Sequence, residues 1–226
     1  MSSIPGIPAD FFTSQPQGVA TSVQLLLILT VLSLAPAILI LMTSFTRIII
    51  VLSFVRTSLS TQQMPPNQIL IGLALFLTFF IMAPVYGQIN ANAVQPYLKG
   101  NITQQQAVRR SEVPIKQFMA RETREKDLQL FMDYGHYKTP KRVQDIPLTA
   151  LVPAFTISEL KTAFQMGFMI FIPFLVIDMV VASILMAMGM MMLPPVMISL
   201  PFKILLFIMV DGWYMIVESL LKSYQG

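Results

Sequence analysis

Four ionisable residues, Asp178, Lys203, Asp211 and Glu218, lie inside long apolar stretches of the sequence. A charged side chain costs about 2.5 to 3.5 kcal/mol at the centre of a membrane helix, so each of these residues implies a partner or a function. Lys203 and Asp211 are eight positions apart and do not face each other on one helix, so their partners must come from another segment or another chain. Ion pairs between packed helices are the main interpretation, and a proton relay or an intramembrane protease are alternatives. The charges that we expect to be buried or to lie at subunit contacts are Asp178, Lys203, Glu159, Lys161 and Asp211.

Residue types argue against catalysis and against a bound cofactor. An aspartate dyad needs neighbouring carboxylates that share a proton, and the flanks IDM and VDG lack the glycine-rich motif of intramembrane aspartyl proteases. The lone His136 falls in the polar stretch YGHYK, and no phosphate-binding loop or dinucleotide fingerprint occurs. The absence of cysteine and the single histidine exclude thiolate and multi-histidine metal centres. We therefore expect a protein that is not an enzyme and has no cofactor.

A methionine-rich run, MAMGMMMLPP (186–195), is the most unusual segment of the chain. Methionine is unbranched and polarizable, so it fills irregular gaps and adapts to what presses on it. One interpretation is a helix end that packs in the core or faces lipid before a turn. The other is a deformable hydrophobic constriction, of the kind that gates a pore by excluding water.

Composition identifies an integral membrane protein. The chain has 226 residues, of which 55% are hydrophobic and only 12% charged, with a net charge of +4. Residues 99–145 hold ten Lys and Arg and six Asp and Glu, which leaves five of each sign for the rest of the chain. Uncharged gaps at 11–46 and 57–98 exceed the roughly 20 residues that a helix needs to cross a bilayer.

Four apolar blocks predict an all-α membrane protein with two helical hairpins. The blocks cover residues 23–42 with a further run at 48–55, 69–86, 164–192 and 202–221. Pro36, Pro84 and Pro173 should kink or break the helices, and such breaks are tolerated where neighbouring protein packs on them. The predicted organisation is a polar N-terminal segment, a first hairpin, a polar insert and a second hairpin with a methionine-rich tip, with bounds 1–22, 23–86, 87–157 and 158–226.

The polar insert is predicted to be mostly helical. Ser111 is the expected start of a helix that continues to Met132, and Gly135 and Pro140 should end it. A solvated helix that covers the bundle is the simple interpretation. The alternative is that Phe118 and Phe131 dock on a neighbouring subunit, because a single helix offers them few other partners.

The charge distribution alone does not decide on which side of the membrane the polar insert lies. The positive-inside rule would place the ten cations of the insert in the cytoplasm, but it loses force for a loop of about 60 residues that also carries six carboxylates. Residues 1–17 are polar and interrupted by proline, so no secretory signal is visible in this numbering.

Several ordered motifs resemble the FliP family of flagellar and type III secretion export proteins. They cover more than half of the chain, and the insert is more similar to the flagellar branch than to the type III secretion branch. The stretches that carry the resemblance are MTSFTRIIIVLSFVR (42–56), PPNQILIGLALFLTFFIMAPV (65–85), FMARETREKDLQLF (118–131), SELKTAFQMGFMIFIPFLVIDMVVASILMAMGMMMLPP (158–195) and LPFKILLFIMVDGW (200–213).

The resemblance implies a pore-forming subunit of a protein export gate in the bacterial inner membrane, at the flagellar basal body. Five copies would assemble with FliQ and FliR, with FlhB and FlhA nearby, surrounded by membrane lipid and without nucleic acid. Unfolded flagellar subunits would pass through a central channel that a ring of Met190, Met191 and Met192, with Met188 beside it, closes. The resemblance also implies that the polar insert is periplasmic. An ion or proton channel subunit and an assembly scaffold remain as alternatives.

Overall fold

The computed structural model describes residues 29–30, 33–34, 36–61, 63–190 and 193–225. In this part of the chain the regular structure is entirely helical, which confirms the predicted all-α membrane protein. The chain divides into two units, Met1–Ile40 and Leu41–Gly226, and the features described below belong to the second. Its helices are α2 (Phe45–Ser58), α3 (Asn67–Ile89), the π-helix η2 (Asn90–Val94), α4 (Gln95–Leu98), α5 (Gln104–Glu122), α6 (Glu125–Tyr134), the 3₁₀ helix η3 (Val143–Asp145), α7 (Leu148–Ala187), α8 (Pro195–Met209) and α9 (Gly212–Lys222).

Two helices are long and apolar enough to cross a membrane. They are Asn67–Leu98, which joins α3 to its continuation, and α7 with 40 residues. The number rises to four if two bent helix pairs each form one span, namely Pro36–Met42 with α2, and α8 with α9, which meet at 62°. These elements correspond to the four predicted apolar blocks.

The interior prolines do not end the helices. Pro84 lies within α3, Pro153 and Pro173 lie within α7, and Pro201 lies within α8. Each proline removes one backbone donor, and a helix packed among other helices can absorb that loss. Of the predicted kink or break at Pro173, the break does not occur, because α7 continues through this residue.

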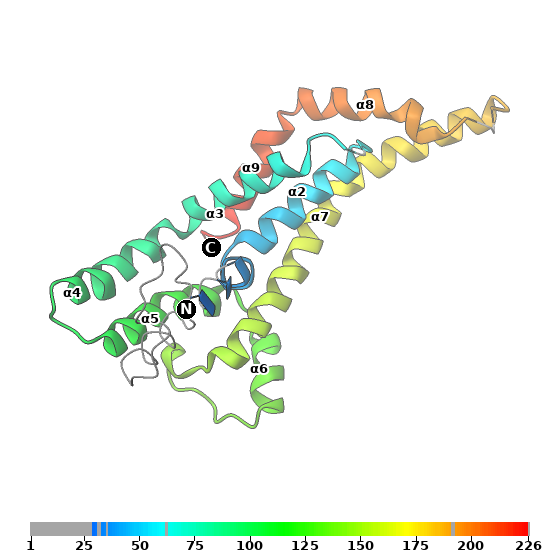
Figure 1. Ribbon diagram of the computed structural model, residues 1–226. Helices are drawn as coiled ribbons and strands as arrows, with labels where there is room; N and C mark the ends of the chain where they lie inside the picture. The colour runs from blue at the N-terminus through cyan, green and yellow to red at the C-terminus, as the bar shows by residue number, and fades with distance from the viewer. Residues whose placement is uncertain (1–28, 31–32, 35, 62, 191–192, 226) are drawn as a thin grey trace, which may run out of the picture. The chain divides into compact units, whose positions relative to one another are not determined.

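Helix α7 is the element on which the others assemble. α2 packs along it, α3 covers α2, and α5 and α6 contact its N-terminal part, whereas α8 turns back along its C-terminal part (Figure 1). The close approach of α2 to α7 needs a glycine. A Cβ atom at Gly167 would lie 2.4 Å from Cγ of Phe54, far inside van der Waals contact.

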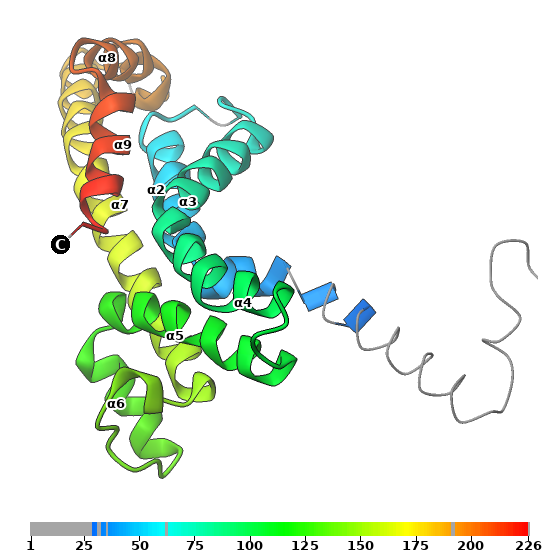
Figure 2. The ribbon, with the colours of Figure 1, turned by 90° about the vertical axis from the view of Figure 1, so that its left-hand side faces the viewer.

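Two apolar clusters form the core. One joins α2, α3, α7, α8 and α9 and contains Ile48, Val51, Leu52, Val55, Leu59, Leu70, Ala74, Ala163, Phe174, Phe207, Ile216 and Leu220. The other fixes the insert to the start of α7 and contains Met82, Val85, Phe118, Met119, Met132, Ile146, Ala150, Leu151, Phe155 and Tyr224. The insert therefore packs on the apolar helices and is not a separate solvated cover (Figure 2).

The insert differs from its prediction in where its helices begin and end. α5 starts at Gln104, where the Thr103 hydroxyl accepts from the Gln106 backbone and the Gln106 side chain accepts from the Thr103 N–H. This reciprocal cap lies eight residues before the predicted one, and Ser111 is inside the helix with its hydroxyl donating to the Ala107 carbonyl. The chain leaves helical geometry at Thr123 and Arg124. α6 ends at Tyr134, followed by Gly135 as predicted.

Candidate functional site

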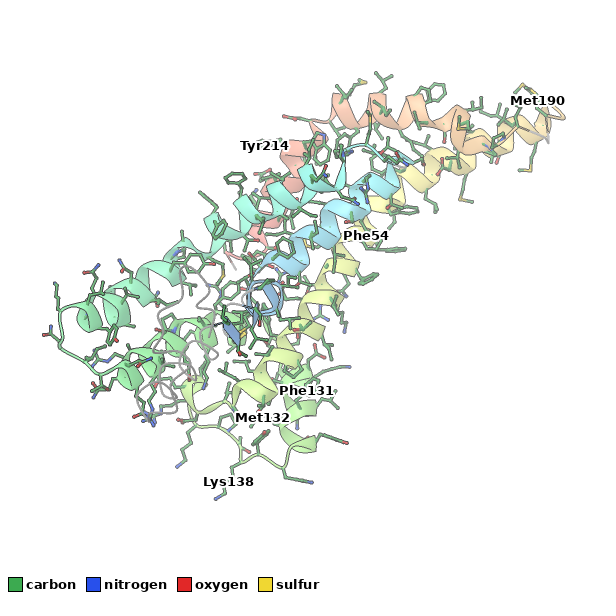
Figure 3. All side chains as sticks on the ribbon, in the orientation of Figure 1. Phe54, Phe131, Met132, Lys138, Met190 and Tyr214 are labelled. Atoms are coloured by element: carbon green, nitrogen blue, oxygen red, sulfur yellow. The ribbon has the colours of Figure 1, made fainter. Side chains whose placement is uncertain are left out.

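The methionine-rich segment forms a tight turn at the free end of the α7–α8 hairpin. The N–H of Gly189 donates to the Met186 carbonyl at 3.1 Å, and the N–H of Met190 donates to the Leu185 carbonyl at 3.0 Å. This pair of bonds is a Schellman motif, and Gly189 supplies its left-handed residue with φ of 72°. Only glycine adopts this conformation without steric cost, so Gly189 sets the direction in which Met190 leaves the helix. Figure 3 shows Met190 at this end.

The methionine side chains of the turn are not covered by this chain. Met188 is 59% exposed and Met190 41%, although both are large apolar groups. Met191 and Met192, which complete the predicted ring, lie outside the described residues. Pro194 and Pro195 then start α8, with Pro195 in the first helical turn, where its missing N–H has no cost.

An apolar cavity of about 460 Å³ lies between α7 and α8, next to this turn. Its walls include Val180 and Ile184 from α7, Met188 directly after that helix, and Ile198 and Phe202 from α8. The space between the two helices therefore has room for another apolar group.

Asp178 and Lys203 form an ion pair between α7 and α8. Nζ of Lys203 lies 2.6 Å from Oδ2 of Asp178, 2.7 Å from Oγ of Ser60 and 3.2 Å from the Ser58 carbonyl oxygen. The hydroxyl of Ser199 donates to the other carboxylate oxygen. Lys203 is 1% exposed and all three of its donors are used, so the pair ties α8 to α7 and to the end of α2. The predicted partner from another segment exists in the same chain, and a role between subunits stays a prediction.

A second ion cluster is centred on Arg47 of α2, at the junction with the insert. Nε of Arg47 donates to Oε2 of Glu159 at 3.0 Å, and Nη2 donates to Oε1 of the same carboxylate and to Oε2 of Glu122 at 3.0 Å. Nη1 donates to the carbonyl oxygen of Ser223 at 3.1 Å and to its hydroxyl at 3.0 Å. Arg47 is 3% exposed and Glu159 is fully buried. One guanidinium thus joins α2, α5, α7 and the segment after α9.

Tyr224 completes this cluster. Its ring lies 3.9 Å below the Arg47 guanidinium carbon, and its hydroxyl donates to Oε2 of Glu159 at 2.6 Å. Burial raises the pKa of the Tyr224 hydroxyl well above its usual value, and the negative charge of Glu159 raises it further, while Arg47 opposes the shift. The hydroxyl therefore stays protonated and remains a donor at neutral pH.

Lys161 and Asp211 are exposed in the single chain, and a place for them at a subunit contact stays a prediction. Lys161 is exposed on α7 beside exposed apolar residues, because the opposite face of that turn packs on α2 and the insert. Asp211 is exposed at the bend between α8 and α9, where its backbone is left-handed with φ of 51°. Glu218 is also at the surface, paired with Lys222 at 2.7 Å.

The two phenylalanines of the insert lie in different environments. Phe118 is buried, with its ring centroid 5.9 Å from that of Phe155 and 6.0 Å from that of Tyr224. Its ring is covered within the chain, so docking of Phe118 on a neighbouring subunit does not fit this position. Phe131 of α6 is half-buried against the same cluster, and a subunit contact there stays a prediction (Figure 3).

Sequence reasoning did not identify Arg47, Glu122, Ser60 and Tyr224 as site residues. Arg47 had a usable signal, because it interrupts an apolar run that otherwise extends from Phe45 to Phe54 with few polar residues. Tyr224 had no signal in the sequence, since an aromatic residue after an apolar helix is common. Among the described residues, no group of His, Cys, Asp or Glu could hold a metal ion.

Comparison with known proteins gives one consistent result. The model of the FliP family matches residues 28–220 of this chain. The flagellar biosynthetic protein FliP of Bacillus subtilis (strain 168) is 68% identical over 214 residues, which are 95% of this chain and 97% of that relative. The protein of the same name from Pectobacterium carotovorum subsp. carotovorum is 50% identical over 221 residues, 98% of this chain and 86% of the relative. That from Aquifex aeolicus (strain VF5) is 50% identical over 208 residues, 90% and 86% of the two chains.

Proposed function

The chain belongs to the FliP family of flagellar biosynthesis and export proteins, and from this membership we propose that it is a pore-forming subunit of the flagellar type III export gate. In this proposal unfolded flagellar subunits pass through a central channel. Met190, Met191 and Met192, with Met188 beside them, form the seal that closes the channel between substrates.

The methionine turn carries the proposal. A large apolar side chain normally gains about 1.5 to 3 kcal/mol from burial, yet Met188 and Met190 are exposed at the end of a hairpin whose turn is held by two backbone bonds. Such a projecting group is suited to meet its equivalents from other copies. Methionine side chains can pack together and exclude water, because they are flexible. They can also move apart around an exported chain whose side chains vary in size.

The long apolar face beyond the chain's own core supports an assembly. From Phe164 onward, α7 exposes large residues with no cover from this chain, and so does α8. We propose that five copies assemble with FliQ and FliR, with FlhB and FlhA nearby, so that these faces meet protein or membrane lipid. The assembly would lie in the bacterial inner membrane at the flagellar basal body, with the polar insert on the periplasmic side.

A proton or ion channel subunit receives less support from the geometry. Asp178 is engaged by Lys203 and Ser199, and Glu218 by Lys222, so neither carboxylate is free to relay protons. An assembly scaffold would be favoured instead if the methionine turn were buried in protein within the complete assembly.

The test is to replace Met190, Met191 and Met192 together with alanine and to measure ion leakage in cells that express the complete gate. We expect assembly and some export to persist while conductance or proton leak rises, because three small side chains leave a wider and less apolar constriction. A matched control replaces Met169, Met209 and Met215, which are exposed methionines outside the turn. A triple variant that leaks no more than its parent or the control, at equal amounts of complex, would rule out the seal.

A further inference from the structure

The backbone of the methionine turn has no free hydrogen-bond donor at its three central positions. The N–H groups of Met188, Gly189 and Met190 each donate to a carbonyl oxygen in the last turn of α7, at 3.0 to 3.1 Å. These bonds satisfy the carbonyl groups at the end of the helix. A new acceptor group at this turn would therefore find these three donors already used.

The cavity next to Met188 has no donor either. Its volume is about 460 Å³, and its wall consists of aliphatic side chains, Met188 and Phe202, none of which carries a nitrogen or oxygen atom. A cavity with such a lining stays dry, although a water molecule occupies only about 30 Å³ in the liquid. Entry of water into this space is therefore limited by the polarity of the lining and not by its size.

Oxidation of a methionine changes that polarity. When a thioether reacts with hydrogen peroxide, the sulfur is oxidised by two electrons and forms a bond to one peroxide oxygen, the O–O bond breaks, and the other oxygen leaves as water. The product is a sulfoxide, which is polar and accepts hydrogen bonds through its new oxygen. Met188 is 59% exposed and Met190 41%, so a molecule as small as hydrogen peroxide can reach both side chains.

Their place in the hairpin separates these two methionines from those inside the helices. Met188 and Met190 follow the last residue of α7, whereas Met169 and Met179 lie within this candidate membrane span. Met64 is similarly placed in the turn between α2 and α3 and is 73% exposed. Met64 therefore provides a comparison for a methionine in a turn that has no part in the proposed seal.

We propose that Met188 and Met190 are oxidation sites at which a peroxide opens the methionine seal. A sulfoxide oxygen there finds no free donor in the described backbone of the turn or in the cavity wall, so it takes its hydrogen bonds from water. Water at the turn and in the cavity disrupts the apolar constriction that excludes ions. Methionine sulfoxide reductases reverse the reaction, which makes it a switch. This inference rests on the proposed seal and adds a chemical means of regulating it.

The test treats membranes that carry the complete gate with hydrogen peroxide and compares their proton leak, followed with a pH-sensitive dye, before and after treatment. Peptide mass spectrometry detects each sulfoxide as a gain of about 16 Da. We expect sulfoxide at Met188 and Met190 and a leak about tenfold above that of untreated membranes, a change that corresponds to about 1.4 kcal/mol. Methionine sulfoxide reductase with a thiol reductant should return the leak to its untreated level.

Two leucine variants show which sulfur atoms are responsible. Replacing Met188 and Met190 together with leucine removes both sulfurs and keeps apolar side chains of similar volume. Each variant is compared with its own untreated membranes, and the leak of this double variant should not rise with peroxide. Met64→Leu is the matched control, and its leak should rise as much as that of the parent.

Three results would overturn the inference. They are an equal rise in leak in the double leucine variant, a parent that carries both sulfoxides and leaks no more than before, and no sulfoxide at Met188 and Met190 at a peroxide dose that oxidises Met64. The alanine variant of residues 190–192 separates this inference from the seal itself. If that variant leaks and the oxidised parent does not, the seal stands and only the oxidation switch is wrong.

Discussion

The half of α7 next to the insert and the half that leads to the methionine turn differ in how much of their surface this chain covers. The first half buries a residue in nearly every turn, namely Ala150, Leu151, Ala154, Phe155, Ser158, Glu159, Ala163 and Gly167. In the remaining 20 residues only Phe174 and Leu185 are buried. The second half is the more apolar in sequence, with Asp178 and Ser183 as its only polar residues, so composition does not explain why less of it is buried.

What explains it is the number of elements that pack on each half. The first half contacts α2, α5 and α6, and the Arg47 cluster joins α2 and α5 to it, whereas the second half contacts α8 and the end of α2. We infer that the first half is the part of the molecule that is stable in a single chain. The second half depends on other chains for its burial, and the predictions below test this division.

The largest expected effect is at the Arg47 cluster. Arg47→Ala should lower the free energy of unfolding by about 3 to 5 kcal/mol, because it leaves Glu159 charged and fully buried without its partner. The measurement is chemical unfolding of the full chain in detergent, followed by the fluorescence of Trp213. Lys203→Ala should lower the free energy of unfolding by a smaller amount, since Asp178 is 25% exposed and keeps its hydrogen bond from Ser199. If Lys203→Ala lowered the free energy of unfolding more than Arg47→Ala, the first half of α7 would not be the more stable part of the single chain.

A pair of identical substitutions compares the two halves directly. Phe118→Ala should cost about 3 to 5 kcal/mol, because its buried ring fills space between Phe155 and Tyr224. Phe168→Ala should change the stability of the isolated chain by less than about 0.5 kcal/mol, because Phe168 is 63% exposed. Phe168→Ala should instead reduce the yield of assembled complex in mild detergent. Similar unfolding curves for the two variants would contradict this comparison.

Tyr224 gives a pH-dependent prediction. Because burial raises the pKa of its hydroxyl in the folded chain, ionisation favours the unfolded chain above about pH 10. The stability that Tyr224 contributes is complete below that pH and is lost as pH rises toward the folded pKa. Tyr224→Phe should cost about 1.5 to 3 kcal/mol at neutral pH, and its difference from wild type should shrink above about pH 10. A constant difference up to about pH 11 would be the contrary result.

The smallest expected effect concerns helix contact. Gly167→Ala should cost about 1 to 3 kcal/mol, because the new methyl group would overlap the ring of Phe54. Combining it with Phe54→Leu should recover part of that loss. Gly72→Ala is the control, since nothing lies within 4 Å of a Cβ at that position, and it should be neutral or slightly stabilising.

The sequence predicted the helical class and the apolar blocks because the charges are so unevenly distributed. The Asp178–Lys203 pair also had a signal that was not used. The two residues lie almost equally far from Met190, so a turn there brings them opposite each other. The start of α5 differs from the predicted cap at Ser111, although Thr103 with Gln106 has the spacing of a capping box. The Arg47 cluster could not be predicted, since its members come from four separated segments whose packing no local pattern specifies.

The hydrogen bonds from Arg47 to Ser223 also have a consequence for synthesis and membrane insertion of the chain. The two residues are separated by 176 positions, so at about 5 to 20 residues per second roughly 10 to 35 seconds pass between their synthesis. During that interval the arginine is already near or in the membrane without its final acceptors. The nascent chain must keep it hydrated or lend it another partner, and the junction with the insert can close only after the last apolar helix has left the ribosome.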